Sequence, residues 1–356
     1  MAAPPFVHSR HGRKVRPDVQ TGGAPSAEQP RAFIAAEHEV HALHGRVLGV
    51  PRFNFSLTAG GRLANHLPMA VLPPNKRFDM ESLAVHAAKL PPAPQVFGRL
   101  VAAINDGDCS LDRMAEFVRL DAALTSQLLR VANSALFGFR SQAGTVEEAV
   151  LRIGLKELHR IVGLCTAAIV FRADMTVYAT QAELLWGNAV TTAVAMERLC
   201  QATGNDPALG YTAGLLRSVG KMVLARHAAG RVAPYPNDGT SLPDWETAAF
   251  GCTHAHVGAA LCELWRFPRP VVVALRDHLH PAANPPGSAL THLLNLAGHL
   301  ATGLDRGLPG EAMLWSNDPA RFPTTGLTDE RIEELQMETI LEVDRMKTML
   351  EFIRTG

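Results

Sequence analysis

The chain has 356 residues, of which 47% are apolar and 19% charged, so it is long enough to bury a sizeable core. Lysine plus arginine and aspartate plus glutamate each number 34, which excludes attraction to nucleic acid or membrane through overall charge. The five cysteines form no CxxC pair and mostly lie in apolar runs, which favours buried free thiols in a reducing cytoplasm.

The first part of the chain contains little that predicts chemistry. Residues 1–30 mix Pro, Gly and Ala with charge and lack periodicity, which predicts a disordered tail. Residues 31–82 form an N-terminal extension of ambiguous structure. The N-terminus has no apolar signal-peptide core, and the longest apolar run, Ile161–Phe171, is too short to span a bilayer. We therefore expect a cytoplasmic protein with no membrane partner.

Sustained helical periodicity begins near residue 83 and predicts a first helical subdomain over 83–175. Ser110 is a good N-cap, and Thr145-Val-Glu-Glu is a capping box for a helix that Gly154 ends. Every predicted element is a helix and every connection is short. This pattern is typical of a helical bundle and predicts an all-α fold.

A second helical stretch covers residues 180–282. An Ala-rich helix spans 182–202, and Asp206-Pro207 supplies the start of a helix expected to run to about Gly220. Residues 283–356 are expected to be a C-terminal helical extension. Its final helix, capped by Thr328, has an apolar stripe that we expect to pack on its own domain rather than on a partner.

Four segments carry a resemblance to a known family; they are Leu90–Val96, Asp121–Gly138, Thr145–Gly154, and Ala213–Lys221 followed by Val257–Trp265. Through them, residues 83–282 resemble the HDOD domain, a bacterial relative of the HD phosphohydrolases. The resemblance implies two packed helical subdomains, of which the second is an HD-type bundle, in a signal-transduction protein. The signature positions it marks are Asn133, Ser134, Gly138, Gly154, Gly214, Gly220 and Trp265.

The resemblance also shows where metal ligands would stand. A catalytic HD site needs His and Asp side chains on one or two metal ions, which activate a water to attack a phosphate ester. The corresponding positions hold Asn188, Arg217 and Ser218. Arginine is cationic at any working pH and cannot ligate a metal. We therefore predict that the chain is not an enzyme and carries no cofactor.

Other polar residues remain near these positions. His254 and His256 are two apart and so diverge around a helix, while Asp277, His278 and His280 lie at a predicted helix end. Histidines without a nearby carboxylate make a weak metal site, so structural roles are favoured. The candidate vestigial pocket comprises Asn188, Arg217, Ser218, Lys221, His254, Asp277 and His278.

Two interpretations of Arg217 remain open. Together with Lys221, four residues on, it could bind the phosphate of a nucleotide. Alternatively, Arg217 pairs with an internal carboxylate such as Asp277, which is favoured because a partly buried arginine must be paired.

The favoured hypothesis is a non-catalytic regulatory protein that acts by binding a protein or a small ligand, with other bacterial signalling proteins as partners and no nucleic acid. The alternatives are a nucleotide-sensing receptor that uses Arg217 and Lys221, and a residual metal-dependent phosphohydrolase. Fold resemblance by itself does not decide among them.

Overall fold

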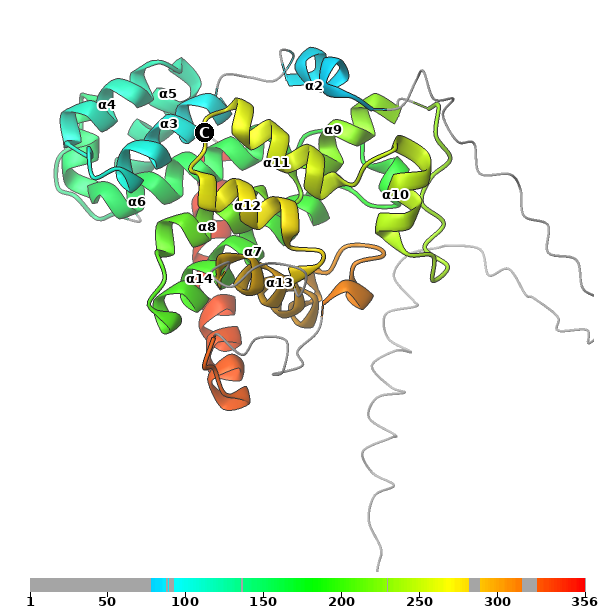
Figure 1. Cartoon of the computed structure of the whole chain (residues 1–356). Helices are drawn as coiled ribbons and strands as arrows, with labels where there is room; N and C mark the ends of the chain where they lie inside the picture. Colours follow the sequence, from blue (N-terminus) through cyan, green and yellow to red (C-terminus); the bar gives the residue numbers. More distant parts are fainter. Residues whose placement is uncertain are drawn as a thin grey trace, which may run out of the picture. The chain divides into compact units, whose positions relative to one another are not determined.

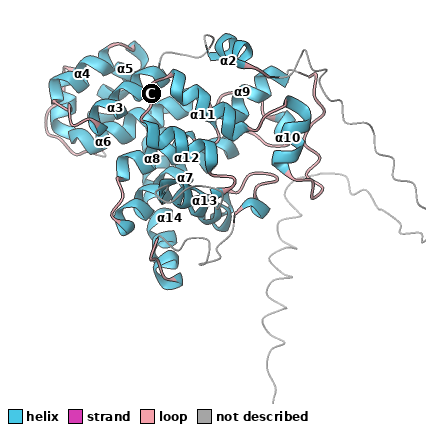
Figure 2. Cartoon of the chain, in the orientation of Figure 1, coloured by secondary structure: helices cyan, strands magenta, loops and turns pink. Residues whose placement is uncertain are grey.

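A computed structural model describes residues 78–87, 89, 93–135, 137–228, 230–281, 289–315 and 325–355. These residues belong to one compact unit, residues 66–356. The predicted tail and nearly all of the predicted N-terminal extension lie outside the described residues. In the described ranges every regular element is a helix and no strand occurs, so the all-α prediction is confirmed (Figures 1 and 2). None of these helices is both long and apolar enough to cross a bilayer.

The first subdomain is built around one long helix. Its helices are α3 (Ala93–Asn105), α4 (Leu111–Arg119), α5 (Ala122–Ala132) and α6 (Val146–Val170), and α6 contacts the other three. The predicted caps are present: Ser110 Oγ accepts from Arg113 N at 3.3 Å, and Thr145 Oγ1 accepts from Glu148 N at 3.2 Å. These caps start α4 and α6 where the sequence predicts.

Two signature residues of this subdomain have a structural explanation. Gly154 adopts φ 77° and ψ 168° inside α6, a left-handed backbone that favours glycine, so it breaks α6 into the two helical segments that the sequence predicts. The Asn133 amide donates to Ala143 O at 3.0 Å and accepts from Ala143 N, which holds the loop between α5 and α6 closed.

The second subdomain is a bundle built around α7. Its helices are α7 (Ala182–Thr203), α8 (Pro207–Leu216), α9 (Val219–Ala228), α10 (Leu242–Phe250), α11 (His254–Leu264), α12 (Arg269–Asp277) and α13 (Ala289–Ala301). α7 packs against α8 and α13, and α11 packs against α9 and α12. The prediction of one helix as far as Gly220 is wrong, because α8 ends at Leu216 and α9 begins at Val219. Arg217 and Ser218 therefore lie at a helix junction.

Helix α2 (Met80–Ala87) packs mainly on α9 and α11. The expected start of the first subdomain at residue 83 thus falls inside a helix that packs on the second subdomain. The amide of Phe78 donates to Phe250 O at 3.0 Å and attaches the start of this segment to α10.

The two subdomains meet where α6 crosses α8. A Cβ built at Gly163 of α6 would lie 3.0 Å from Tyr211 and Leu215 of α8, so the two helices approach closely there. His159 Nε2 lies 3.0 Å from Thr212 Oγ1, and burial lowers the pKa of His159 to about 3. This interface is therefore close-packed and carries a neutral imidazole.

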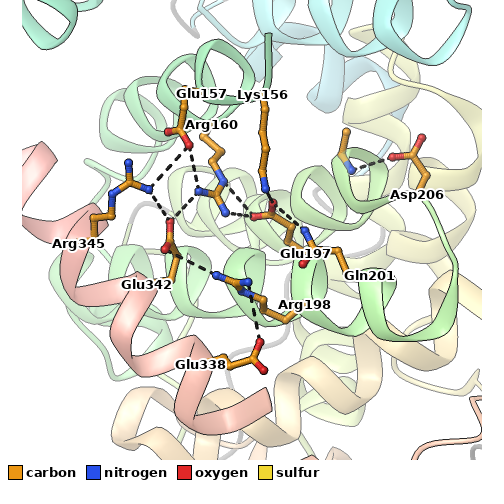
Figure 3. Close-up of polar contacts among 11 residues, drawn as sticks. Lys156, Glu157, Arg160, Glu197, Arg198, Gln201, Asp206, Glu338, Glu342 and Arg345 are labelled. Atoms are coloured by element: carbon orange, nitrogen blue, oxygen red, sulfur yellow. Dashed lines mark hydrogen bonds and ion pairs between the residues drawn. The ribbon is translucent and has the colours of Figure 1, made fainter. Parts of the chain in front are cut away.

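The final helix, α14 (Asp329–Thr355), packs on α7 and α5 of the same chain, as expected, and it buries Leu335, Val343 and Met346. Charged residues reinforce this packing (Figure 3). Arg160 of α6 is 5% exposed, and its guanidinium contacts Glu197 of α7 and, at 2.7 Å, Glu342 of α14. One buried arginine thus joins three helices.

Two signature glycines allow close helix contacts in the second subdomain. A Cβ at Gly214 would lie 2.5 Å from Thr192 O of α7, and a Cβ at Gly220 would clash with His254 O of α11. The clashing atoms belong to backbone, which cannot move aside as a flexible side chain can. Glycine at these positions sets the spacing of α8 and α9 against their neighbours.

We predict that Gly220→Ala destabilises the fold by about 1–3 kcal/mol, because the added methyl overpacks the α9–α11 contact. Urea unfolding followed by circular dichroism measures the change. Gly144→Ala is the matched control, since a Cβ there would meet only Glu148 Oε2 at 4.0 Å. Equal stability of the two variants would contradict the packing argument.

We predict that Glu342→Gln weakens the attachment of α14, because it removes the carboxylate that α14 offers to buried Arg160. The expected loss is about 1.5–3 kcal/mol, typical of a charged hydrogen bond. The control is Glu338→Gln, one turn earlier, whose half-exposed ion pairs predict a loss below about 1 kcal/mol. Hydrogen exchange should show faster exchange in α14 for Glu342→Gln only.

Candidate functional site

Six of the seven predicted pocket residues are buried within the second subdomain. Asn188 comes from the middle of α7, Arg217 and Ser218 from the α8–α9 junction, and Lys221 from the first turn of α9. His254 begins α11, and His278 follows the last residue of α12. All six side chains are buried, with exposed fractions of 1% or less.

A carboxylate that the sequence did not single out lies between the two cations. Glu311, immediately before the short helix η5 (Ala312–Leu314), accepts from Arg217 Nη1 at 2.9 Å through one oxygen and from Lys221 Nζ through the other. Glu311 is 0% exposed. The internal pairing expected for Arg217 is therefore present, but its partner is Glu311.

The prediction that Arg217 pairs with Asp277 is wrong. Its carboxylate pairs with Arg276, with 2.7 Å between Arg276 Nη2 and Asp277 Oδ2, and the Arg276 side chain is 47% exposed. Asp277 is the last residue of α12, and this pairing at the helix end takes its carboxylate to a surface arginine.

Further hydrogen bonds and aromatic contacts surround the Arg217 and Lys221 side chains. Asn188 Oδ1 accepts from Arg217 Nη2, and Asn188 Nδ2 donates to Arg306 O at 2.6 Å. The Trp315 ring lies 4.9 Å from the Arg217 guanidinium carbon, and the Tyr178 ring lies 5.6 Å from Lys221 Nζ. Aromatic faces stabilise cations at such distances, so both charges lie in compensated surroundings.

The charges alter the pKa of the shared carboxylate. Burial by itself would raise the pKa of Glu311, but neighbouring Arg217 and Lys221 hold it at about 2. Burial lowers the pKa of Lys221, and Glu311 opposes this shift. Glu311 is thus an ionised carboxylate that offsets part of the positive charge of Arg217 and Lys221.

Two buried imidazoles adjoin this centre. His254 Nδ1 lies 2.8 Å from Glu246 Oε1, which also accepts from the Tyr178 hydroxyl at 2.8 Å. His278 Nδ1 donates to Leu275 O at 2.7 Å, and burial holds the pKa of His278 well below its usual value. The two rings lie 5.7 Å apart. His256, in contrast, is exposed and contacts Thr253 Oγ1, and His280 is exposed.

The metal of catalytic HD proteins does not fit these residues. The Nε2 atoms of His254 and His278 have no hydrogen-bond partner in the described structure, so two nitrogen atoms are free to ligate a metal ion. However, the described residues contain no group of three or more His, Cys, Asp or Glu side chains arranged to hold a metal. Glu311 is already shared by two cations, and Arg217 would repel a metal ion.

Comparisons with known proteins agree with this architecture. The HDOD domain model matches residues 90–281, more than half of the chain. An uncharacterized protein of Treponema pallidum (strain Nichols) is 27% identical over 210 residues, which cover 55% of this chain and only 39% of that relative. The match ends before Glu311, so the carboxylate of the charged centre lies beyond the family segment.

Solved structures show the same fold. A protein from Marinobacter aquaeolei VT8, provisionally assigned to signal transduction, superimposes with a TM-score of 0.60 at 22% identity, covering 90% of this chain and 66% of the other. An HDOD domain protein of unknown function from Geobacter sulfurreducens gives 0.54 at 21% identity, covering 74% and 97%. A provisionally assigned phosphohydrolase from Shewanella amazonensis SB2B gives 0.53 at 22% identity, covering 76% and 96%. With its two packed helical subdomains and its matched segment, the chain belongs to the HDOD family of signalling domains.

Proposed function

We propose that this chain is a non-catalytic signal-transduction module that acts by binding a protein partner or a small ligand. The observation that supports the proposal is the buried ion-paired centre of Arg217, Lys221 and Glu311, which includes a position that the sequence resemblance assigns to a metal ligand. A buried arginine bound to a buried carboxylate stabilises one internal arrangement and activates no water. The signalling assignment of the Marinobacter relative supports the same role.

The alternative that Arg217 and Lys221 bind a nucleotide requires unpaired cations, and neither cation is unpaired. Both cations are paired with Glu311 and buried among aromatic rings. An incoming phosphate would have to displace Glu311, leaving that carboxylate buried without a cation. The proposal therefore gives these residues a structural role and places ligand recognition elsewhere.

Replacing Glu311 tests the structural role of the centre. We predict that Glu311→Gln lowers the free energy of unfolding by about 3–5 kcal/mol, because Arg217 and Lys221 would remain buried without a carboxylate. Asp277→Asn is the matched control, and its half-exposed pair predicts a loss below about 1 kcal/mol. Urea unfolding compares the two, and a negligible loss for Glu311→Gln would contradict the role.

The lowered pKa of Glu311 also predicts how its contribution to stability depends on pH. The pKa of Glu311 is about 2 in the folded protein, below its ordinary value of 4.5, so its contribution to stability is complete above about pH 4.5. That contribution is lost as pH falls through about 2. The stability difference between wild type and Glu311→Gln should thus be constant near neutrality and shrink below about pH 4.5. A difference that grows on acidification would overturn the assignment.

The phosphohydrolase alternative is tested directly. We expect purified protein to contain far less than one equivalent of Fe, Mn or Zn by metal analysis, because the two free imidazole nitrogens lack a third ligand. We also expect no turnover of bis(4-nitrophenyl) phosphate with any of these metals added. Stoichiometric metal together with turnover that is lost in His254→Ala would refute the non-catalytic proposal.

A further inference from the structure

A separate cavity lies at the side of the second subdomain, and none of the ion-paired residues Arg217, Lys221 and Glu311 lines it. It has a volume of about 460 Å³ and is lined by the end of α6, the first turns of α7, the π-type turn η4 (Thr302–Arg306) and α14. Ligand cavities in proteins typically measure ~300–1,000 Å³. The space is therefore large enough for a small molecule of mononucleotide size.

The cavity lining is cationic. Arg172, Arg306 and Lys347 line it, against the single acid Glu183 among the described lining residues. Half-buried Arg306 has no side-chain hydrogen bond or ion pair within the described structure, and exposed Arg172 uses only Nε, which donates to Ala168 O at 3.0 Å. Lys347 pairs with Asp344 at 3.0 Å. Most of the guanidinium donors at this cavity are thus available to an anion.

A flat aromatic surface lies next to these donors. Trp186 lines the cavity, and the side chain of Arg306 lies against its neighbour Gly187. An indole beside guanidinium groups suits a ligand that combines a planar ring with a phosphate, because aromatic rings stack on indoles and phosphates bind arginine.

We propose that this cavity binds a nucleotide, with the phosphate on Arg306, Arg172 and Lys347 and the base against Trp186. The site differs from the Arg217–Glu311–Lys221 centre in location and in the availability of its cations. A nucleotide in this cavity would be the small ligand of the proposed signalling role. The binding site itself is argued from the cavity, and only its biological role rests on the proposed function.

The cavity is connected to the buried centre through one side chain. The backbone oxygen of Arg306 accepts from Asn188 Nδ2, while Asn188 Oδ1 accepts from Arg217. Lys347 belongs to α14, which Glu342 joins to Arg160. A nucleotide bound here would therefore contact both the η4 turn beside the charged centre and the C-terminal helix.

Calorimetric titration of the full chain tests the site with AMP and GMP, with adenosine and inorganic phosphate as partial ligands. We expect saturable binding of at least one nucleotide, and binding at least about 10-fold weaker for adenosine and for phosphate, since each lacks half of the contacts. Phosphate binding as tight as nucleotide binding would show a phosphate site only and overturn the proposal. No saturable binding at millimolar nucleotide would do the same.

Variants locate the binding. Arg306→Gln and Lys347→Gln should each weaken the nucleotide at least about 10-fold without changing the thermal unfolding midpoint. The control Arg269→Gln removes an exposed arginine that begins α12 and does not line the cavity, and it should bind like wild type. Binding that both cavity variants leave unchanged would refute this location. The metal and turnover assays judge the non-catalytic proposal separately, so each can fail alone.

Discussion

A buried carboxylate shared by two buried cations is the interaction on which the second subdomain depends. Taking Glu311, Arg217 and Lys221 out of water is costly, and their mutual attraction compensates only when the geometry is close. The segment after α13 must therefore return to the α8–α9 junction, where its glutamate contacts both cations. Asn188 and Trp315 complete the surroundings of Arg217, so residues from three parts of the chain meet at one charge centre.

This centre gives the family framework a different chemistry. An HD bundle with metal ligands places a reactive water among its helices, whereas this bundle buries one carboxylate between two cations. The surrounding contacts are close-packed: Gly214 and Gly220 bring α8 and α9 against the backbones of α7 and α11. A second ion-pair network around Arg160 attaches α14 across the subdomains (Figure 3). Two buried ion-pair networks therefore join helices that lie far apart in the sequence.

Local signals were predictable from the sequence because they act over a few residues. Ser110, Thr145 and Asp206 each accept from backbone amides two or three positions along, so a short window suffices to recognise a helix start. Gly154 breaks α6 through its own backbone angles. The break at Arg217 was missed because no proline or capping motif marks it, and because the arginine at the junction pairs with Glu311, 94 positions away.

The sequence alone was enough to predict the all-α class, most helix starts, and the need of a buried arginine for an internal acid. Only the tertiary structure decided which acid that is. Asp277 is nearer in sequence, but it ends α12 and pairs with Arg276 at the surface, whereas Glu311 lies beyond the family segment and enters the core. The physical reason is that ion pairing depends on distance in space. No local sequence pattern encodes a contact between residues that only the folding of the chain brings together.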